Sequence, residues 1–288
     1  MTLPGFFVIG GQKCGTTTLY EDLRLQPQVA LADKEGRTLC GPGVSPAELR
    51  DRYSSIFGCA DPKAVHGEVS SFYSMLPDDP EIPVNASRVA PHAKVIYIVR
   101  EPISRVISHH HHDFGFGFVG PDIDEAVHRY PPLIDNTRYA TQIKPWIEIF
   151  GAEAVLVLKF ERYIADRRSG LRGVLEFIGG SDADLIDPGT AAHNAAATKR
   201  IATGARRRIA QSSFYRTQVR PRLPVRLRRR INQMILTKAP PRPAPPARAT
   251  LEYIADQMRP EVEELAALTG NEPFWDLNLA VSAHSARR

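Results

Sequence analysis

The feature that most restricts the fold of this chain is a short apolar run, residues 6–9 (FFVI), followed at once by the glycine-rich segment 10–18 (GGQKCGTTT). A short, wholly apolar run that ends in glycines is typical of a strand buried on both faces of a parallel sheet. Residues 16–25 then carry leucines at a spacing that favours a helix. A strand, a glycine-rich loop and a helix in this order form a site for a phosphate group, because loop N–H groups turn inward and the helix N-terminus is positive.

The side chains of the loop strengthen this interpretation. Lys13 supplies a mobile positive charge, and Thr16 and Thr17 supply hydroxyl donors. Gly10 and Gly15 have the spacing of the pattern G-x-x-x-x-G-K-[ST], but Thr16 stands where that pattern has its lysine. The loop therefore predicts a phosphate site unlike that of the common nucleotide triphosphatases. A tight strand-to-helix turn without a ligand is the alternative.

Further apolar runs alternate with helical patterns along the chain. We expect strands at 65–69, 94–99 and 154–158, and helices at 103–112, 139–150 and 169–178. Strands that alternate with helices predict an α/β fold, a parallel sheet with helices on both faces.

A second polar segment follows the strand expected at 94–99. Arg100 comes directly after this strand, and Ser108 lies about two helical turns further on. Both can face the carboxyl edge of the sheet, where α/β proteins bind ligands, and a guanidinium and a hydroxyl suit a phosphate. The alternative for Arg100 is a surface ion pair, with Glu101 or Asp113. Arg105 is expected to face solvent.

Both segments resemble the signatures of one family. Residues 10–19 resemble the 5′-phosphosulfate loop of sulfotransferases, G-x-x-K-x-G-T-T-x-L, and residues 100–108 (REPISRVIS) resemble the family's second signature, R-x-P-x-x-R-x-x-S. The resemblance implies a P-loop-like three-layer α/β sandwich. It also implies in-line transfer of a sulfuryl group from 3′-phosphoadenosine 5′-phosphosulfate (PAPS) to a hydroxyl of a carbohydrate, a lipid-linked or another small-molecule acceptor, without a metal ion.

The same resemblance assigns the residues that contact the donor. Arg100 and Ser108 would hold the ribose 3′-phosphate, and Lys199 and Arg200 lie where relatives have a basic loop that closes over the nucleotide. The full set of expected donor contacts is Gly11, Gln12, Lys13, Cys14, Gly15, Thr16, Thr17, Arg100, Ser108, Lys199 and Arg200. Solvated charges are the alternative for Lys199 and Arg200.

Two residues are expected to be catalytic. Lys13 would stabilise charge on the departing phosphate. Glu68 would be the general base, since its segment resembles the E-K-S-x-x-Y of heparan-sulfate-type relatives, although Val69 replaces the lysine there. His66 and the run His109–His112 are the alternative bases. Consecutive histidines on a helix point about 100° apart, so no metal site is predicted. A Lys34–Glu35 pair also resembles a family element but carries little weight.

Charge is distributed unevenly along the chain. The net charge is +5, yet residues 188–251 contain 15 Lys or Arg and no Asp or Glu, so the rest of the chain has a net charge near −10. The stretch 206–230 mixes arginines with apolar residues, which favours a basic cover over the acceptor cleft or contact with an anionic membrane surface. Aromatic residues for stacking are sparse there, which argues against nucleic acid as a partner.

We expect one domain with two parts. Residues 1–200 would form the sulfotransferase-like α/β core, and residues 201–288 the basic extension, a Pro-rich linker and a C-terminal helix that packs on the core. No run approaches 18 apolar residues and no secretory leader is evident. Three cysteines without a metal or disulfide spacing indicate a reducing compartment. We therefore expect a cytoplasmic enzyme that can lie at the membrane surface.

Two other functions stay open. A P-loop nucleotide kinase or triphosphatase would require a lysine directly after Gly15, and an aspartate for magnesium at the end of an apolar strand. A non-catalytic basic protein that docks on membranes would leave Lys13, Arg100 and Ser108 without a shared purpose. The oligomeric state and the identity of the acceptor are not predicted.

Overall fold

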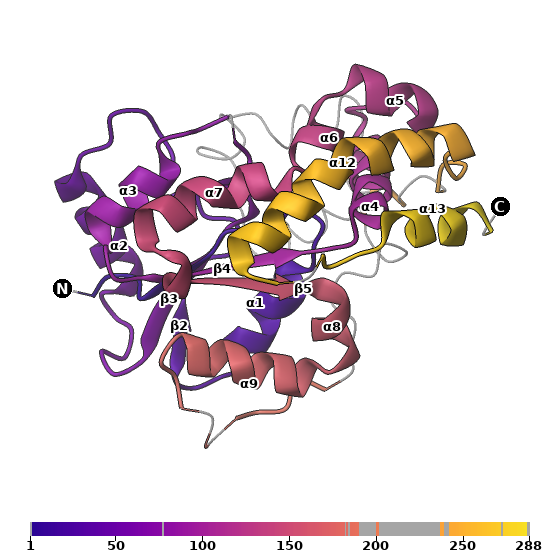
Figure 1. Ribbon diagram of the computed structural model, residues 1–288. Helices are drawn as coiled ribbons and strands as arrows, with labels where there is room; N and C mark the ends of the chain where they lie inside the picture. The colour runs from indigo at the N-terminus through magenta and orange to yellow at the C-terminus, as the bar shows by residue number, and fades with distance from the viewer. Residues whose placement is uncertain are drawn as a thin grey trace.

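The centre of the molecule is a five-stranded parallel sheet with the strand order β2-β3-β1-β4-β5 (Figure 1). The computed structural model describes residues 2–76, 78–181, 183, 185–189, 200–201, 237–238, 242–271 and 273–286. The strands are β1 (Phe6–Val8), β2 (Val29–Leu31), β3 (Val65–Val69), β4 (Lys94–Val99) and β5 (Val155–Lys159). Because all five run in the same direction, the loops that follow their carboxyl ends meet at one edge of the sheet.

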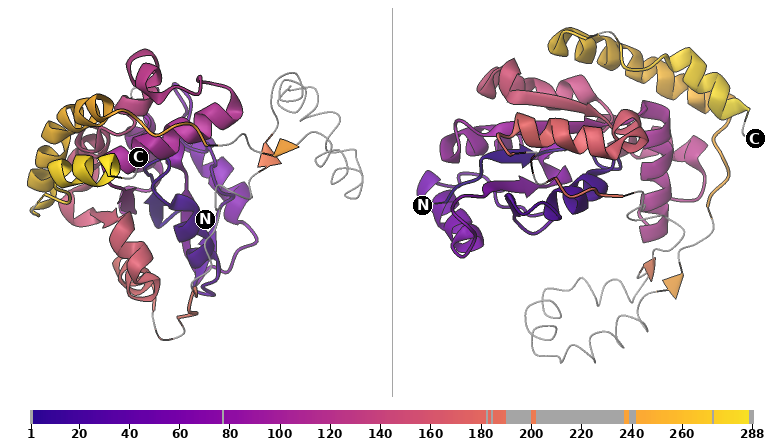
Figure 2. Two further views of the ribbon diagram at one scale, coloured as in Figure 1. Left: turned by 90° about the vertical axis from the view of Figure 1, so that its right-hand side faces the viewer. Right: turned by 90° about the horizontal axis from the view of Figure 1, so that it is seen from below.

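Helices cover both faces of the sheet and make three layers (Figures 1 and 2). One face is covered by α1 (Thr16–Arg24), α8 (Phe160–Ala165) and α9 (Arg167–Phe177), and the other by α2 (Pro46–Phe57), α3 (Ile82–Val89), α7 (Tyr139–Phe150) and part of α12 (Arg248–Thr269). In β1, Phe6 and Val8 pack on the first face and Phe7 on the second, as does Ile9 directly after the strand. Both sides of the strand are therefore buried, which explains why the run is wholly apolar.

A second group of helices lies beyond the carboxyl end of β4. It consists of α4 (Pro102–Phe116), α5 (Ile123–Arg129), α6 (Pro132–Asp135), α13 (Leu277–Ser285) and the first half of α12. Figure 2 shows α13 beside α12. Leu251, Ile254 and Met258 of α12 pack in this group, whereas Leu265 packs in the core over the sheet. Helix α12 thus packs both against this second group of helices and against the core over the sheet.

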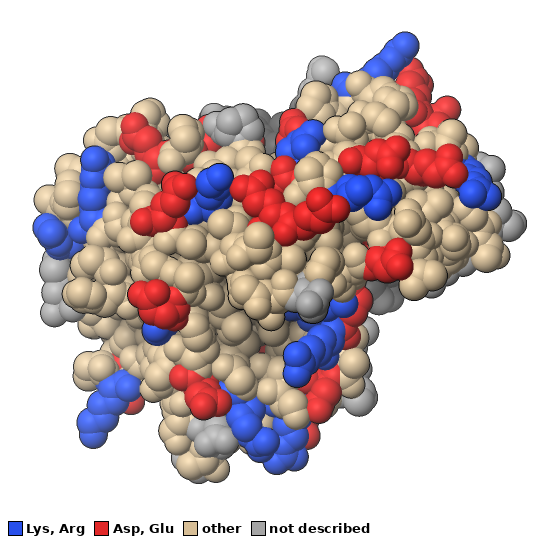
Figure 3. Space-filling view, in the orientation of Figure 1, with Lys and Arg blue, Asp and Glu red and all other residues tan. Residues whose placement is uncertain are grey.

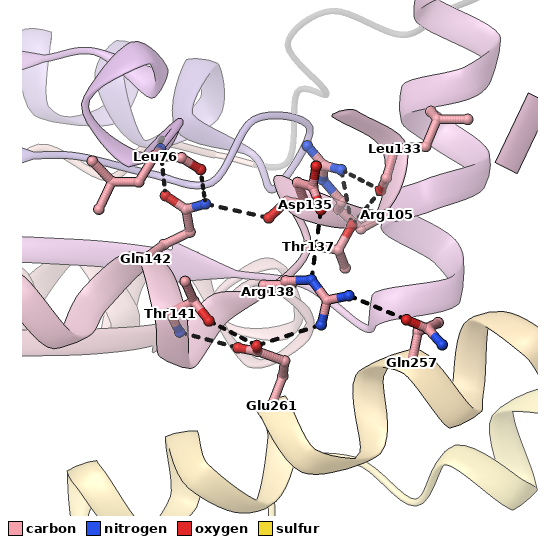
Figure 4. Close-up of polar contacts among 10 residues, drawn as sticks. All are labelled: Leu76, Arg105, Leu133, Asp135, Thr137, Arg138, Thr141, Gln142, Gln257 and Glu261. Carbon is pink, nitrogen blue, oxygen red and sulfur yellow. Dashed lines mark hydrogen bonds and ion pairs between the residues drawn. The ribbon is translucent and has the colours of Figure 1, made fainter. Parts of the chain in front are cut away.

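Polar contacts also hold α12 on α7 and on the turn before it (Figure 4). Glu261 accepts hydrogen bonds from the backbone N–H of Thr141 (3.0 Å) and from its hydroxyl (2.8 Å), and Arg138 donates to Gln257 at 3.1 Å. In the space-filling view of Figure 3, acidic and basic side chains alternate over this part of the surface. Lys144 of α7 and Glu264 of α12, 3.2 Å apart, are one such exposed pair.

The α/β fold and the four predicted strands are confirmed, with bounds that differ by one residue at most. The helix expected at 103–112 continues to Phe116, where Gly117 at φ 73° ends it in the left-handed region. The short strand β2 and the helices α2 and α3 were not predicted from the sequence. The basic stretch 206–230 lies outside the described residues; the pairs Arg200–Ile201 and Thr237–Lys238 that flank it form a two-stranded antiparallel ladder apart from the main sheet (Figure 2).

Of the helices that the structure describes, none combines the length and the apolar character that a bilayer-crossing segment needs.

Candidate active site

The two signature segments meet in one cavity of about 520 Å³ at the carboxyl ends of β1, β3 and β4. We call it the first cavity. Its walls come from the glycine-rich loop and the start of α1, from the loop after β2, from the turn after β3, from the end of β4, from α4 and from Phe160. Apart from the loop residues, the polar side chains that line it are Lys34, Glu35, Ser71, Arg100, Ser108 and His112.

The glycine-rich loop follows β1 closely and is shaped by two left-handed residues. Gly11 donates to the carbonyl oxygen of Ile98 at 2.7 Å, which ties the loop to β4. Lys13 has φ 69° and Gly15 has φ 96°. A side chain at Gly15 would also collide with the ring of Phe160, so both the backbone and the space require glycine. The loop then delivers Thr16 and Thr17 to the first turn of α1, where backbone N–H groups have no partner within the helix.

A second cavity of about 560 Å³ shares Lys13, Arg100 and Ser108 with the first. Its remaining walls include the Pro-rich segment 242–246 and His284 of α13. These three shared side chains therefore lie at the boundary of two adjoining spaces. The Pro-rich segment and His284 were not predicted as site residues, because neither carries a local pattern that indicates ligand contact.

Arg100 lies against the loop. One nitrogen of its guanidinium donates to the carbonyl oxygen of Lys13 at 3.3 Å, and the group lies 5.1 Å from the ring centre of Phe160. The two acids considered as surface partners have other bonds in the described part of the chain. Glu101 caps the N-terminus of α4 by accepting from two backbone N–H groups at 2.7 Å, and Asp113 bonds to histidines. Arg100 thus borders the cavity that its signature predicts.

The expectation that Arg105 faces solvent is wrong. Its side chain is fully buried. Its Nε donates to the carbonyl oxygen of Gln12 at 3.0 Å, and Nη1 donates to the carbonyl oxygen of Leu133 (3.1 Å) and to Thr137 Oγ1 (2.9 Å); Figure 4 shows the contacts of Nη1. The sequence of α4 does not disclose that the glycine-rich loop and α6 pack on this side of the helix. Arg105 thus ties the glycine-rich loop to α4.

Glu68 is also fully buried. Its carboxylate accepts hydrogen bonds from Thr38 Oγ1 at 2.8 Å and from the Tyr53 hydroxyl at 2.5 Å. In the sheet, Glu68 is in register with Phe7 of β1, so it lies beside the strand and not beside the glycine-rich loop that follows it. The backbone at Gly36 passes so close that a side chain there would collide with Glu68 Oε1. Glu68 is therefore covered by a loop rather than among the residues that line either cavity, and its role as general base stays a prediction.

The histidines proposed as alternative bases have different environments. His66 is buried against the ring of Phe57, and burial lowers its pKa. His109 and His110 are buried; His109 Nε2 lies 3.1 Å from Asp113, and His110 Nε2 lies 3.0 Å from the carbonyl oxygen of Gly120. His111 lines the second cavity and His112 the first. Within the described ranges, no three His, Cys, Asp or Glu side chains gather in a way that would hold a metal ion.

Other residues of the donor set lie as follows. Cys14 is buried, and its Sγ is 3.5 Å from the hydroxyl of Tyr139. Burial raises the pKa of its thiol. The Cys14 side chain therefore packs beneath the loop, against Tyr139, rather than toward the cavity. Lys199 lies outside the described residues. Only the backbone of Arg200 is described. Their roles over the nucleotide stay predictions.

Lys34 and Glu35 are more important than the sequence suggested. Glu35 has φ 60°, pairs with Lys34, and accepts from the backbone N–H (2.9 Å) and the hydroxyl (2.8 Å) of Ser71. These bonds join the loop after β2 to the turn after β3. The family element at 34–35 was the signal that would have found this wall of the cavity.

Comparison with known proteins identifies the family. Residues 3–217 match the family model described as the sulfotransferase domain. Heparan sulfate glucosamine 3-O-sulfotransferase 3A1 of Mus musculus is 25% identical over 193 residues, which cover 62% of this chain and 46% of the relative. Carbohydrate sulfotransferase 15 of Homo sapiens is 23% identical over 273 residues, which cover 71% of this chain and 48% of the relative. The chain spans about half the length of these curated relatives.

Among solved structures, a sulfotransferase from Alicyclobacillus acidocaldarius has a TM-score of 0.65 and 19% identity, covering 94% of this chain and 98% of that chain. At this identity the likeness supports the fold alone. It extends over nearly the whole of both chains, including the helices that follow the described core.

Proposed function

This chain belongs to the sulfotransferase domain family, and we propose that it transfers a sulfuryl group from PAPS to a hydroxyl of a glycan or another small-molecule acceptor. The observation that supports this most directly is that Lys13, Arg100 and Ser108 line both adjoining cavities. A nucleotide with anionic groups on both its 5′ and its 3′ carbon could bind Lys13 with one group and Arg100 and Ser108 with the other. A nucleotide triphosphate has no 3′-phosphate and would leave Arg100 and Ser108 without a phosphate to bind.

Each group at this boundary has a role in the proposed reaction. PAPS supplies the sulfuryl group and a phosphate that leaves with negative charge. Lys13 and the N-terminus of α1 stabilise that charge, and the hydroxyls of Thr16 and Thr17 donate to it. Arg100 and Ser108 hold the 3′-phosphate, which fixes the nucleotide at its other end and so aligns the reacting atoms. In this proposal Lys13 and Arg100 supply the positive charge that binds the donor, and no metal ion is required.

The acceptor would lie on the side of the first cavity formed by Lys34, Glu35 and Phe72. The guanidinium of Arg37 lies 3.9 Å from the ring centre of Phe72, so this wall combines charge with an aromatic face. Relatives named for heparan sulfate glucosamine and for carbohydrate support a sugar hydroxyl as the target. A lipid-linked sugar stays within the proposal, because specificity depends on loops that differ among members of one fold.

Binding of the reaction product tests the donor site without knowledge of the acceptor. We expect adenosine 3′,5′-bisphosphate to bind in calorimetry with no need for magnesium, and Lys13→Ala to weaken binding by about tenfold or more, since a charge-assisted hydrogen bond contributes about 1.5–3 kcal/mol. Lys144→Ala, which removes an exposed lysine on α7, is the matched control. Binding of magnesium–ATP in preference to the bisphosphate would favour a kinase. Failure of the intact protein to bind the bisphosphate would refute the proposal.

The cytoplasmic location, contact of residues 206–230 with an anionic membrane surface, and the division of the chain at residue 200 remain predictions.

A further inference from the structure

His112 and Asp113, on the last turn-and-a-half of α4, form a side-chain pair that the donor site does not use. We propose that His112 is the general base that takes the proton of the attacking hydroxyl, and that Asp113 is a positioning residue that orients its imidazole. This inference rests on the proposed function, because a base is needed only where a hydroxyl attacks. Sequence reasoning left the base open between Glu68 and several histidines.

The position of His112 is the first argument. His112 lines the same cavity as Lys13, Thr16 and Thr17, and its side chain is 25% exposed. It lies one helical turn beyond Ser108, on the same face of α4. The side chain therefore borders the cavity that also contains the loop residues proposed to contact the sulfuryl end of the donor.

The bond to Asp113 is the second argument, because it determines which imidazole nitrogen has the lone pair. Asp113 is buried, and its oxygens lie 3.0 Å from His112 Nδ1 and 3.1 Å from His109 Nε2. Burial alone would raise the pKa of this carboxyl, but the hydrogen bonds from His109 and His112 outweigh it and hold the pKa well below the usual value. An ionised carboxylate only accepts, so Nδ1 of His112 carries the hydrogen and Nε2 has the lone pair. A histidine oriented by a buried carboxylate is a general arrangement for a base.

The other carboxylates are less suited to the task in this structure. Glu68 is covered at Gly36 and its oxygens bond to Thr38 and Tyr53. Glu35 does line the first cavity, but its oxygens bond to Lys34 and Ser71 and so join two loops. Glu68 is thus closed off from the first cavity, and Glu35 already links the loop after β2 to the turn after β3.

The other histidines are also less suited. His66, His109 and His110 are buried, and burial lowers the pKa of His109 to about 4. His111 borders the second cavity, and its pKa is lowered first by burial and then by the charges of Arg242 and Lys13. Of the described histidines, His112 is the one that lines the first cavity.

The proton transfer balances without any further reactant. As the hydroxyl oxygen bonds to sulfur and the bond from sulfur to the leaving phosphate oxygen breaks, the hydroxyl proton moves to Nε2 of His112. The imidazolium that results is stabilised by Asp113, and the proton then passes to water. The charged and titratable groups around His112 are Asp113 and His109 on α4, Tyr130 beyond α5 bonded to Asp113, and Lys13, Arg100, Lys34 and Glu35 across the cavity.

The tautomer of His112 is the direct test, and it needs no acceptor. In nitrogen-15 NMR of the histidine-labelled full chain with adenosine 3′,5′-bisphosphate bound, the signal lost in His112→Gln identifies this residue. We expect the spectrum to show the hydrogen of the His112 imidazole on Nδ1, the nitrogen that faces Asp113. Asp113→Asn should shift the population toward the Nε2–H form, a change that loss of packing alone would not cause. An Nε2–H tautomer in the unmodified protein would overturn the inference.

Turnover provides the second test. With sulfur-35-labelled PAPS, sulfate release to water and transfer to a heparan-sulfate oligosaccharide are measured for His112→Gln, for Glu68→Gln, and for the exposed control His92→Gln. We expect His112→Gln to lower kcat by about 100-fold or more, the usual contribution of a general base. His92→Gln should match the unmodified chain.

Nucleotide binding separates the two proposals. If the intact chain binds adenosine 3′,5′-bisphosphate and His112→Gln keeps both that affinity and kcat within about threefold, the base assignment fails and the donor site stands. A full loss of turnover in Glu68→Gln, with His112→Gln unaffected, would assign the base to Glu68. If the intact chain does not bind the bisphosphate, the proposed function itself fails.

Discussion

Removal of the guanidinium of Arg105 should loosen the glycine-rich loop, although this residue lines neither cavity. Arg105→Met keeps the length of the side chain and removes three hydrogen bonds, to the carbonyl oxygens of Gln12 and Leu133 and to Thr137 Oγ1. The carbonyl oxygen of Leu133 keeps a partner, because Thr137 Oγ1 also donates to it at 2.7 Å. The carbonyl oxygen of Gln12 loses the bond that holds the loop to α4.

The size of the effect follows from two opposed contributions. Three hydrogen bonds from a charged group contribute about 1.5–3 kcal/mol each. Against this, a buried guanidinium costs several kcal/mol of desolvation, and the structure shows that burial lowers the pKa of Arg105 and that its Nη2 has no hydrogen-bond partner among the described residues. The net loss should be about 2–4 kcal/mol, because the hydrogen bonds outweigh a desolvation cost that methionine no longer bears.

Thermal unfolding with and without adenosine 3′,5′-bisphosphate measures this effect. A loss of about 2–4 kcal/mol should lower Tm by about 3–7 °C for a chain of this length, and the stabilisation by ligand should shrink because the loop is less ordered. Arg129→Met is the matched control, since Arg129 is 78% exposed and pairs with Glu125 within α5. If Arg105→Met unfolds within about 2 °C of the unmodified chain and binds the bisphosphate equally well, the view that Arg105 holds the loop is incorrect.

Three further predictions concern the loop, the histidine pair and the basic stretch. Gly15→Ala should weaken bisphosphate binding by about tenfold or more in calorimetry, because alanine is strained at φ 96° by about 1 kcal/mol and also collides with Phe160. Chemical denaturation should show the free energy of unfolding falling as pH drops from about 6.5 to 4. Burial lowers the pKa of His109 to about 4 in the folded protein, so the unfolded chain takes up a proton first over this range. Asp113 stays ionised over this window, and an unchanged denaturation midpoint would contradict the burial argument. Residues 206–230 should make the full chain co-sediment with phosphatidylserine vesicles at low salt and release it at high salt, whereas binding to neutral vesicles would count against an electrostatic contact.

Several features of this protein could be predicted from the sequence because they depend on neighbouring residues. The run at 6–9 is apolar on both sides, as a strand covered on both faces requires, and the glycines within residues 10–15 allow the tight turn into the helix. Arg100 and Ser108 reach the glycine-rich loop because parallel strands end at the same edge of the sheet, so chain direction alone brings two distant segments together.

The tertiary structure decided what no local pattern discloses, namely which polar side chains are covered by other segments. Arg105 has the sequence context of an exposed helix residue, but the loop at Gln12 and the turn at Leu133 pack against it. Glu68 lies near the end of β3, where a general base was predicted, yet the backbone at Gly36 covers it. His112, in a run of histidines with no such pattern, lines the first cavity. Periodicity and chain direction are properties of a segment, but burial of a charge depends on its neighbours in space, and these are set only when the whole chain has folded.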